Sequence, residues 1–237
     1  MIVIPMLGRS TRFFDAGYTV PKFQLALGGE TVFAKSLRSF EQLFGSEHFL
    51  FIVRSDYNAK KFVAEEVTRL GLSDFRIIEM QCETRGQAQS VMHGTIDYEG
   101  EEPLIVFNID TIRHNFSMPT LSEFGDGFLE VFTALGDGWS FVEPADIHRV
   151  ARTTEKERIS ELCSNGLYGF ARLLDFRAAY TDYDNKKLTV LGELYIAPLY
   201  NFLIEQGSQI MYRIVDNKLI EHCGIPEDYE LLKRKFG

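Results

Sequence analysis

Short apolar runs alternate with segments of helical spacing over the first 112 residues, and this alternation constrains the fold more than any other feature of the chain. Residues 32–44 and 60–70 carry apolar side chains at intervals of three and four, and a glycine follows each segment, as is typical of a helix end. Continuous apolar strands are buried on both faces, so the pattern predicts a mostly parallel sheet between helices, with right-handed crossovers. The predicted strands are residues 2–4, 49–53, 75–78 and 104–107.

The pattern of predicted strands and helices changes after Asp110. Short strands with turns rich in glycine and aspartate follow, with no long helix between them, which predicts an antiparallel extension or lid. The strands predicted in this part are residues 128–134, 139–142, 149–153 and 167–171. The helical pattern then returns at 175–183 and 193–205, followed by a strand near 209–215 and a last helix from Pro226.

Length, charge and cysteine content limit the class of protein. A chain of 237 residues is expected to form a single domain with one site. Its formal charge of -9 argues against a nucleic-acid surface but allows a small anionic ligand on a local basic cluster. The 3 cysteines are far apart and form no Cys-x-x-Cys pair, which favours a reducing cytoplasm. Neither a leader peptide nor an apolar run of membrane length is present, so we expect no membrane partner.

The first predicted strand leads directly into the loop LGRSTR, residues 7–12. In an open α/β sheet, ligands bind beyond the carboxyl ends of the strands. Gly8 permits close backbone approach, and the guanidinium groups of Arg9 and Arg12 suit bidentate phosphate contacts. The loop matches neither the Walker A pattern nor the dinucleotide fingerprint. The alternative is a surface loop with solvated arginines.

A family resemblance rests on this loop together with Pro21-Lys22 and Gly28-Gly29. Their order and spacing resemble the signature of the sugar-phosphate nucleotidyltransferase (nucleoside-diphosphate-sugar pyrophosphorylase) family, although Leu7 and Ser10 replace a usual Ala and Gly. The resemblance extends from Ile2 to about Tyr229. It implies a Rossmann-like three-layer α/β/α mixed sheet of the GT-A-like nucleotidyltransferase type, with a small antiparallel extension. It also implies a nucleotide-binding half, residues 1–112, and an acceptor-binding half with a lid, residues 113–237.

The resemblance further implies roles on the nucleotide side. Arg12 would bind the β- and γ-phosphates of a nucleoside triphosphate, and Lys22 would stabilise charge at the α-phosphorus. Gly86 and Gln87 resemble the segment that lies under the base; the structural alternative is a helix capped by Thr84. The loop residues that would hold the triphosphate are Leu7, Gly8, Arg9 and Ser10.

Acceptor roles follow from the same resemblance. Glu155 and Lys156 would face a phosphorylated acceptor, with Lys156 toward its phosphate, unless they form a solvated hairpin tip. Asn165 belongs to a segment that resembles the family's Asn-x-Gly-x-Tyr-x-Phe element. Glu193 would contact acceptor hydroxyl groups or simply favour a helix N-terminus.

Asp110 is the predicted metal ligand. It follows the apolar run 104–109, and Mg²⁺ in phosphate sites takes one or two protein carboxylates. The alternative is a local Asx turn. His222 stands where many family members carry a second metal-binding aspartate, and neutral imidazole is a poor ligand for Mg²⁺. Three alternatives stay open: Asp110 holds the metal with phosphates and water, Asp216 substitutes, or activity is lost.

The function predicted from these residues is that of a Mg²⁺-dependent nucleotidyltransferase. It would transfer a nucleoside monophosphate group from a triphosphate to a sugar phosphate or similar small phosphomonoester, releasing pyrophosphate, for capsule or other surface-polysaccharide synthesis. The alternatives are a cytidylyltransferase acting on a non-sugar phosphate, a glycosyltransferase, and a non-catalytic nucleotide-binding module. The base, the acceptor and a homo-oligomeric state are left open.

Overall fold

The computed structural model describes residues 1–237, which form two compact units interleaved along the chain. Unit I consists of Ile2–Glu83, Phe107–Phe116 and Lys218–Gly237. Unit II consists of Met1, Thr84–Val106 and Ser117–Asn217. The expected division at residue 112 into nucleotide-binding and acceptor-binding halves concerns ligands, and it stays a prediction.

Unit I contains a parallel sheet made from the predicted apolar runs. Strand β4 (Phe49–Arg54) pairs with β1 (Ile2–Met6) on one side and with β5 (Phe75–Met80) on the other. The run from Phe49 to Val53 is fully buried, as expected for a central parallel strand. Helix α3 (Ala59–Arg69) packs on β4 and β5 and is followed by Gly71 at φ +81°, the left-handed conformation that ends many helices.

The other elements of unit I are shorter. They are α1 (Thr11–Asp15), η1 (Lys22–Gln24), β2 (Ala26–Leu27), β3 (Glu30–Thr31), α2 (Val32–Leu37), η2 (Arg38–Leu43), β7 (Thr111–Arg113), η3 (Asn217–Leu219), β13 (Ile220–His222) and α8 (Pro226–Phe236). Strands β7 and β13 form an antiparallel ribbon, and α8 starts with proline and two acidic residues, a favourable first turn.

The single helix expected over residues 32–44 is interrupted. It consists of α2 followed by the 3₁₀ turns of η2, because Phe40 leaves the helical conformation at φ −112°. The Phe40 ring lies 4.8 Å from the rings of both Phe107 and Phe116, measured between centroids. These partners are distant in sequence, so this packing could not be read from the local pattern.

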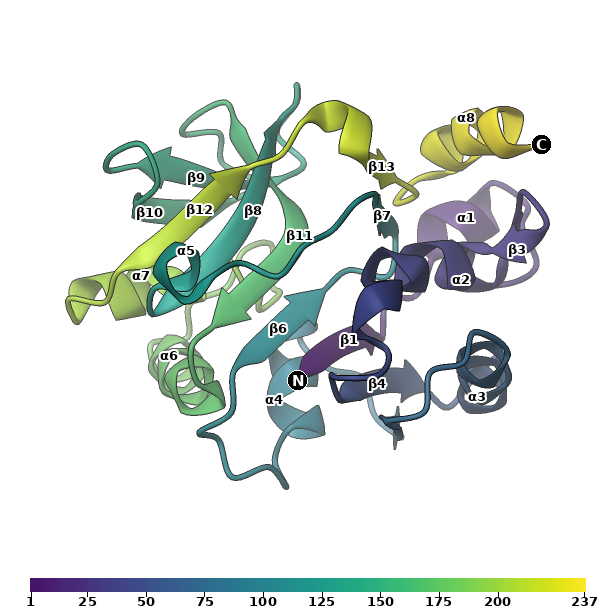
Figure 1. The fold of residues 1–237 in the computed structure, drawn as a ribbon, viewed down its shortest axis with the longest axis horizontal. Coiled ribbons are helices and arrows are strands. Elements are labelled where there is room, and N and C mark those ends of the chain that lie inside the picture. The colour runs from purple at the N-terminus through teal and green to yellow at the C-terminus, as the bar shows by residue number, and fades with distance from the viewer. The chain divides into compact units, whose positions relative to one another are not determined.

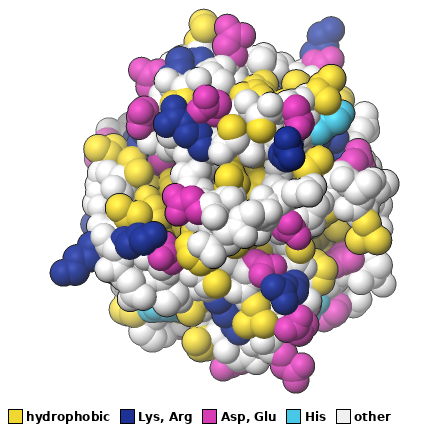
Figure 2. Space-filling model, turned by 90° about the vertical axis from the view of Figure 1, so that its left-hand side faces the viewer, with side chains coloured by type: hydrophobic (Ala, Val, Ile, Leu, Met, Phe, Trp, Pro, Cys, Tyr) yellow, Lys and Arg dark blue, Asp and Glu magenta, His cyan; other side chains and the backbone are white.

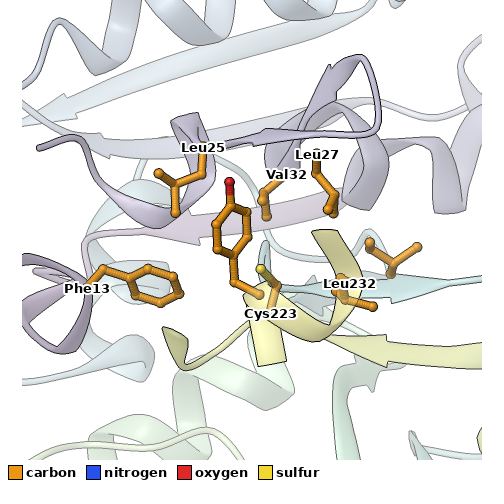
Figure 3. Close-up of a cluster of buried hydrophobic side chains, with 8 residues drawn as sticks. Phe13, Leu25, Leu27, Val32, Cys223 and Leu232 are labelled. Carbon is orange, nitrogen blue, oxygen red and sulfur yellow. The ribbon is translucent and has the colours of Figure 1, made fainter. Parts of the chain in front are cut away.

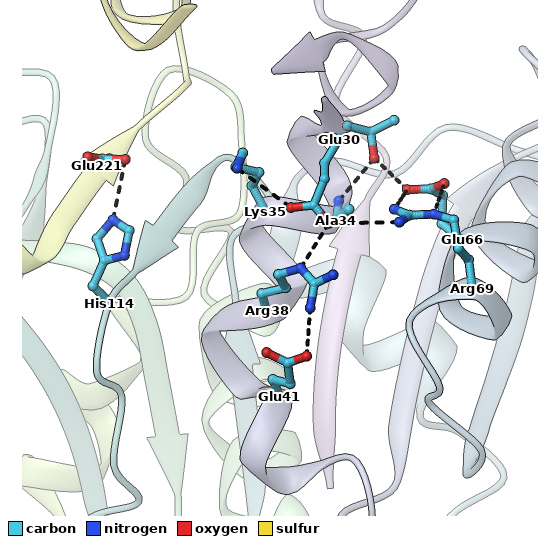
Figure 4. Close-up of polar contacts among 10 residues, drawn as sticks. Glu30, Ala34, Lys35, Arg38, Glu41, Glu66, Arg69, His114 and Glu221 are labelled. Atoms are coloured by element: carbon cyan, nitrogen blue, oxygen red, sulfur yellow. Dashed lines mark hydrogen bonds and ion pairs between the residues drawn. The ribbon is translucent and has the colours of Figure 1, made fainter. Parts of the chain in front are cut away.

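A polar network joins α2 and α3 within unit I (Figure 4). The Thr31 hydroxyl accepts the Ala34 N–H at 3.1 Å, which caps α2, and donates to Glu66 at 2.6 Å. Glu30 accepts a hydrogen bond from Arg38 at 2.9 Å. The hydrogen bonds of Thr31 are partly buried, whereas the Arg38–Glu30 pair lies at the surface, and each contributes about 1 kcal/mol.

Helix α8 covers a hydrophobic cluster formed mainly by residues from the start of the chain (Figure 3). The Tyr229 hydroxyl also donates to the Ala26 carbonyl at 2.7 Å. Burying each large apolar side chain stabilises the fold by roughly 1.5–3 kcal/mol. The cluster is made of Phe13, Leu25, Leu27, Val32, Ile112, Cys223, Tyr229 and Leu232.

Unit II contains the predicted antiparallel extension. Strands β8 and β11 pair antiparallel, as do β9 and β10, and β12 runs parallel to β8 (Figure 1). Its strands are β6 (Leu104–Phe107, whose last residue belongs to unit I), β8 (Gly127–Thr133), β9 (Ser140–Pro144), β10 (Val150–Glu155), β11 (Leu162–Phe170) and β12 (Ile210–Ile214). Its helices are α4 (Gln87–Gly94), α5 (Leu121–Phe124), α6 (Leu173–Asn185) and α7 (Leu199–Glu205). The predicted α/β class with a mixed sheet is therefore confirmed.

The helix expected over residues 193–205 is wrong in its first part. Helix α7 begins at Leu199, after Pro198, and Glu193 instead forms a β-bridge with Val190. Proline disfavours a helical conformation in the residue before it and lacks the N–H that a continuous helix would need. Residues 193–196 thus form a non-helical segment, and its contacts are important for the site.

The surface shows no gathering of basic side chains on the face drawn in Figure 2, where Lys and Arg alternate with Asp and Glu. This agrees with the acidic formal charge of -9. None of the helices is both long and apolar enough to cross a membrane.

Candidate active site

The loop after β1 in unit I presents its polar groups to solvent. Gly8, Arg9 and Arg12 are exposed, and no atom lies within 4 Å of the position that a Gly8 side chain would take. Arg9 pairs with Glu83, an exposed ion pair that stabilises little. The Arg12 guanidinium makes no hydrogen bond or ion pair within the protein, so it is available to a ligand.

Ser10 ties this loop to Lys22. Its hydroxyl accepts the Lys22 backbone N–H at 3.2 Å. Ser10 has a φ of 53°, in the left-handed region that disfavours residues with a side chain by roughly 1–2 kcal/mol. The position where the family pattern has glycine is thus one that glycine would occupy without strain.

Lys22 and Asp110, which were assigned separate roles from the sequence, form an ion pair. The Lys22 Nζ lies 2.5 Å from Asp110 Oδ2, and the two side chains are 21% and 23% exposed. Burial raises the pKa of Asp110, but the charge and hydrogen bond of Lys22 outweigh it and hold the pKa below its usual value. The Asp110 carbonyl accepts the Cys223 N–H at 2.7 Å, so the backbone at Asp110 is connected to the residue that follows β13.

His222 and Asp228 act electrostatically on Asp110. Burial lowers the pKa of His222 despite the opposing effect of Asp110, which favours the neutral imidazole. Burial and the charges of Glu227 and Asp110 raise the pKa of Asp228. Asp228 was not among the residues predicted from the sequence, where Pro226 marked only the start of the last helix. Asp216, the suggested substitute ligand, belongs to unit II.

The residues around Asp110 can contribute to a Mg²⁺ site without forming a complete one. No group of 3 or more His, Cys, Asp or Glu side chains could hold a metal ion. Mg²⁺ in phosphate sites commonly uses one or two carboxylates and completes its shell with phosphate oxygens and water. Asp110, which already attracts the Lys22 ammonium group, fits the role of a single carboxylate ligand.

The turn at Gly86 in unit II is held by the backbone of Leu194. The Leu194 N–H donates to the Arg85 carbonyl at 2.6 Å, and the Ala88 N–H donates to the Leu194 carbonyl at 3.0 Å. Gly86 has φ +127°, and an added Cβ would lie 2.6 Å from the Leu194 carbonyl oxygen. Only glycine therefore fits this close approach.

The alternative in which Thr84 caps the helix after this turn is wrong. Helix α4 begins at Gln87, with Gly86 at the N-cap position and no side-chain cap. Thr84 instead lies 2.7 Å from the Ser90 hydroxyl, measured between the two oxygens. Gly86 and Gln87 are both partly buried at this helix start.

Glu155 and Lys156 lie at the end of β10 in unit II. Glu155 is 8% exposed and accepts a hydrogen bond from Ser140, and burial raises its pKa. Lys156 has φ 56°, and its N–H donates to the Trp139 carbonyl at 2.8 Å. The Lys156 ammonium group donates to the Tyr195 hydroxyl and lies 4.5 Å from the centroid of its ring. No signal in the sequence indicated Tyr195.

Two predicted acceptor residues differ in exposure. Glu193 is exposed, and its charge contributes to the raised pKa of Glu155. Asn165 is 2% exposed, its amide donates to Glu130 at 2.9 Å, and its amide oxygen accepts the Leu167 N–H at 3.1 Å. The described contacts of Asn165 stabilise β11, and its role toward an acceptor stays a prediction.

A hollow of about 540 Å³ also exists in unit I, but no residue of the 7–22 segment lines it. Several of its charged groups are already paired with one another, among them Lys35 and Arg38 with Glu30. Its lining includes Arg113, His114 and Phe236. The chemistry predicted from the sequence therefore lies elsewhere in the unit, around Lys22.

Comparison with solved structures reveals a similar protein over the whole chain. A nucleoside-diphosphate-sugar pyrophosphorylase from Vibrio cholerae RC9 is 46% identical, with a TM-score of 0.93, covering 99% of this chain and 100% of that one. A UDP-glucose pyrophosphorylase complexed with UDP-glucose is 14% identical, with a TM-score of 0.77, covering 99% and 97%. The inositol-1-phosphate CTP transferase from T. maritima is 16% identical, with a TM-score of 0.75, covering 99% and 95%.

The two distant structures establish the class of fold, which is that of nucleotidyltransferases. The identity and coverage of the Vibrio protein go further: the chain belongs to the nucleoside-diphosphate-sugar pyrophosphorylase family. Neither a protein-family model nor a curated protein sequence matches it.

Proposed function

We propose that this protein is a Mg²⁺-dependent nucleotidyltransferase that transfers a nucleoside monophosphate group from a nucleoside triphosphate to a sugar phosphate or similar small phosphomonoester. Its product serves the synthesis of capsule or another surface polysaccharide. Membership of the pyrophosphorylase family supports the reaction type. The observation that carries the proposal is the pairing of Lys22 with Asp110, beside a loop whose Arg12 guanidinium has no protein partner.

Unit I supplies groups for the triphosphate. Arg12 binds the β- and γ-phosphates, and the exposed backbone around Gly8 permits close approach by phosphate oxygens. Lys22 stabilises charge at the α-phosphorus, and Asp110 would hold Mg²⁺ as a single carboxylate ligand. When bound, Mg²⁺ neutralises negative charge on the triphosphate.

The reaction requires no general base on the protein. An oxygen of the acceptor phosphate attacks the α-phosphorus, a new P–O bond forms, and the bond from the α-phosphorus to the bridging oxygen breaks as pyrophosphate leaves. A phosphate monoester has a second pKa of about 6, so the attacking oxygen is already ionised near neutrality. Catalysis then depends on in-line positioning and charge stabilisation.

Unit II supplies groups for the base and the acceptor. Gly86 and Gln87 face the base, and Lys156 binds the acceptor phosphate. Glu193, which is exposed, accepts hydrogen bonds from acceptor hydroxyl groups. The 3 cysteines are free thiols, which supports a cytoplasmic enzyme with access to nucleoside triphosphates.

The test is pyrophosphate release with each of CTP, UTP, GTP, ATP and dTTP, with Mg²⁺, against a panel of sugar phosphates, phosphocholine and other small phosphomonoesters. Release confined to one triphosphate and one sugar phosphate is expected and identifies both substrates. Release confined to CTP and a non-sugar phosphate would instead identify the cytidylyltransferase alternative. Triphosphate binding without pyrophosphate release with any acceptor would contradict the proposal and favour a non-catalytic binding module. His222, at the position where many family members have a second metal-binding aspartate, is the reason to test for that outcome.

A further inference from the structure

Residues 193–196, here called the strap, cross unit II between two parts of the proposed site. The backbone of Leu194 forms hydrogen bonds on both sides of Gly86, with Arg85 at 2.6 Å and with Ala88 at 3.0 Å. Leu194 itself is 1% exposed, so burial and these hydrogen bonds hold its position. The Gly86 turn therefore fixes the backbone position of the strap.

The next residue of the strap reaches Lys156. The Tyr195 hydroxyl accepts a hydrogen bond from the Lys156 ammonium group, and the Tyr195 ring lies beside the same cation. The backbone of Lys156 is fixed independently by its N–H bond to the Trp139 carbonyl. With both the backbone and the ammonium group held, the flexible side chain has one preferred direction.

We infer that Tyr195 is a positioning residue that orients Lys156 toward the acceptor phosphate and links it, through Leu194, to the turn at Gly86. The identity of the ligand rests on the proposed function; the positioning of the lysine does not. A lysine ammonium group has three donors. Tyr195 uses one of them, so two are left for the oxygens of a phosphomonoester.

A purely structural explanation of the contact is weaker. Both Lys156 and Tyr195 are only partly buried, so the ammonium group has access to water and does not need the hydroxyl to offset burial. The contact fixes the lysine side chain before a ligand binds. A mobile lysine side chain would lose much rotamer entropy on binding, and this cost is reduced when the side chain is already held. The phenol is also neutral, so the positive charge of Lys156 stays available.

Chemical labelling of Lys156 tests the positioning directly. Lysine acetylation with a water-soluble reagent is followed by mass spectrometry for Tyr195→Phe, which removes only the hydroxyl. The matched control is Tyr212→Phe, whose hydroxyl donates to the Asp146 carbonyl at 3.0 Å elsewhere in unit II. We expect labelling of Lys156 to be at least about threefold faster in Tyr195→Phe and unchanged in the control, since hydrogen bonds to charged groups are the stronger ones. Equal rates would overturn the inference.

A second pair of variants tests the link through the strap. Gly86→Ala places a Cβ against the Leu194 backbone, whereas Gly207→Ala introduces a side chain at a similar left-handed φ with no atom within 4 Å. We expect faster labelling of Lys156 in Gly86→Ala only, although Gly86 makes no contact with that lysine. Unchanged labelling in a folded Gly86→Ala protein would refute the link between the turn and the lysine.

Kinetics separates this inference from the proposed function. With the acceptor identified by the pyrophosphate panel, Tyr195→Phe is expected to raise KM for the acceptor about fivefold, with kcat and KM for the triphosphate within twofold, because Lys156 still binds the phosphate but is no longer held in place. An unchanged acceptor KM would overturn the role toward phosphate. A panel without any turnover would contradict the proposed function, while the labelling rates would still decide whether Tyr195 positions Lys156.

Discussion

Lys22 in unit I and Lys156 in unit II are held in different ways. Lys22 is bound to a carboxylate, that of Asp110, with the two charged atoms 2.5 Å apart. Lys156 is bound to a neutral hydroxyl, that of Tyr195, beside an aromatic ring. Both lysines are partly buried, so their environments differ mainly in the charge of the partner.

Under the proposed function, this difference indicates how each lysine would meet a phosphate. A phosphate that approaches Lys22 competes with an anion that is already there, unless a cation takes over Asp110. A phosphate that approaches Lys156 need not displace a carboxylate from a hydrogen bond with the ammonium group, because its hydrogen-bond partner is a neutral hydroxyl, although the charge of Lys156 also acts on the buried Glu155. Lys22 therefore suits a group recruited together with a metal ion, and Lys156 suits a preformed anion site.

Replacing Lys22 is expected to have the largest effect. Lys22→Met should lower kcat/KM by roughly 100-fold to 1,000-fold, as for the loss of one charge-stabilising donor, with little change in melting temperature. The control is Lys35→Met, since Lys35 is also paired with a carboxylate of unit I, Glu30 at 3.6 Å. Comparable losses of activity in both variants would remove the special role of Lys22.

Replacing Lys156 should have a smaller effect that falls on a different parameter. Lys156→Met is expected to raise KM for the acceptor roughly 10-fold to 100-fold, the value of a hydrogen bond to a charged group, while KM for the triphosphate changes little. Steady-state kinetics with each substrate varied in turn checks this. If only KM for the triphosphate increased, Lys156 would belong to the nucleotide side, and it would not differ from Lys22 in the substrate that it binds.

The neighbour of Lys156 predicts a dependence of stability on pH. Burial raises the pKa of Glu155, so the folded protein binds more protons than the unfolded chain between the ordinary pKa of 4.5 and the raised one. Stability from this group is therefore present at low pH and is lost as the pH rises through that window. Glu155→Gln removes this loss, so its free energy of unfolding relative to wild type should increase from about pH 4 to about pH 7.

The control for this measurement is Glu143→Gln on the neighbouring strand. Glu143 is paired with Arg152 near the surface, so its variant shows whether removing any carboxylate from this sheet changes the unfolding free energy in the same way. Denaturant unfolding at both pH values provides the comparison. An identical pH dependence of Glu155→Gln and wild type would show that the buried carboxyl does not titrate as described.

The smallest predicted effect concerns the loop that precedes Lys22. Ser10→Gly and Ser10→Ala both remove the hydroxyl that accepts the Lys22 N–H, but only glycine removes the strain at φ 53°. Ser10→Gly should therefore be more stable than Ser10→Ala by about 1 kcal/mol in urea unfolding. The reverse order would mean that the loop does not keep this conformation in solution.

Much of unit I could be predicted because its elements depend on local patterns. The buried run before Asp110 predicted that carboxylate at a strand end, but its ion pair with Lys22 was not predicted from the sequence. The interruption of the helix at Phe40 could not be predicted, since it involves rings at Phe107 and Phe116. Such contacts between distant parts of a chain leave no periodic signal.

The site in unit II was less accessible to sequence reasoning. Glu155 and Lys156 were recognised by their resemblance to a motif, but Tyr195 was missed because residues 193–196 were assigned to a helix. Pro198 was the local signal against that helix. The hydrogen bonds between the Leu194 backbone and the turn at Gly86 connect residues more than a hundred positions apart, and no sequence pattern predicts them.

The return of the chain to unit I has a consequence for biosynthesis. Phe13, Leu25 and Leu27 leave the ribosome long before Tyr229 and Leu232 of α8, which cover them. The nascent chain therefore carries an open apolar surface until α8 has emerged, the kind of surface that chaperones bind. Premature termination before α8 would leave that surface permanently uncovered, so a truncated product would be a substrate for proteolysis rather than a partly active enzyme.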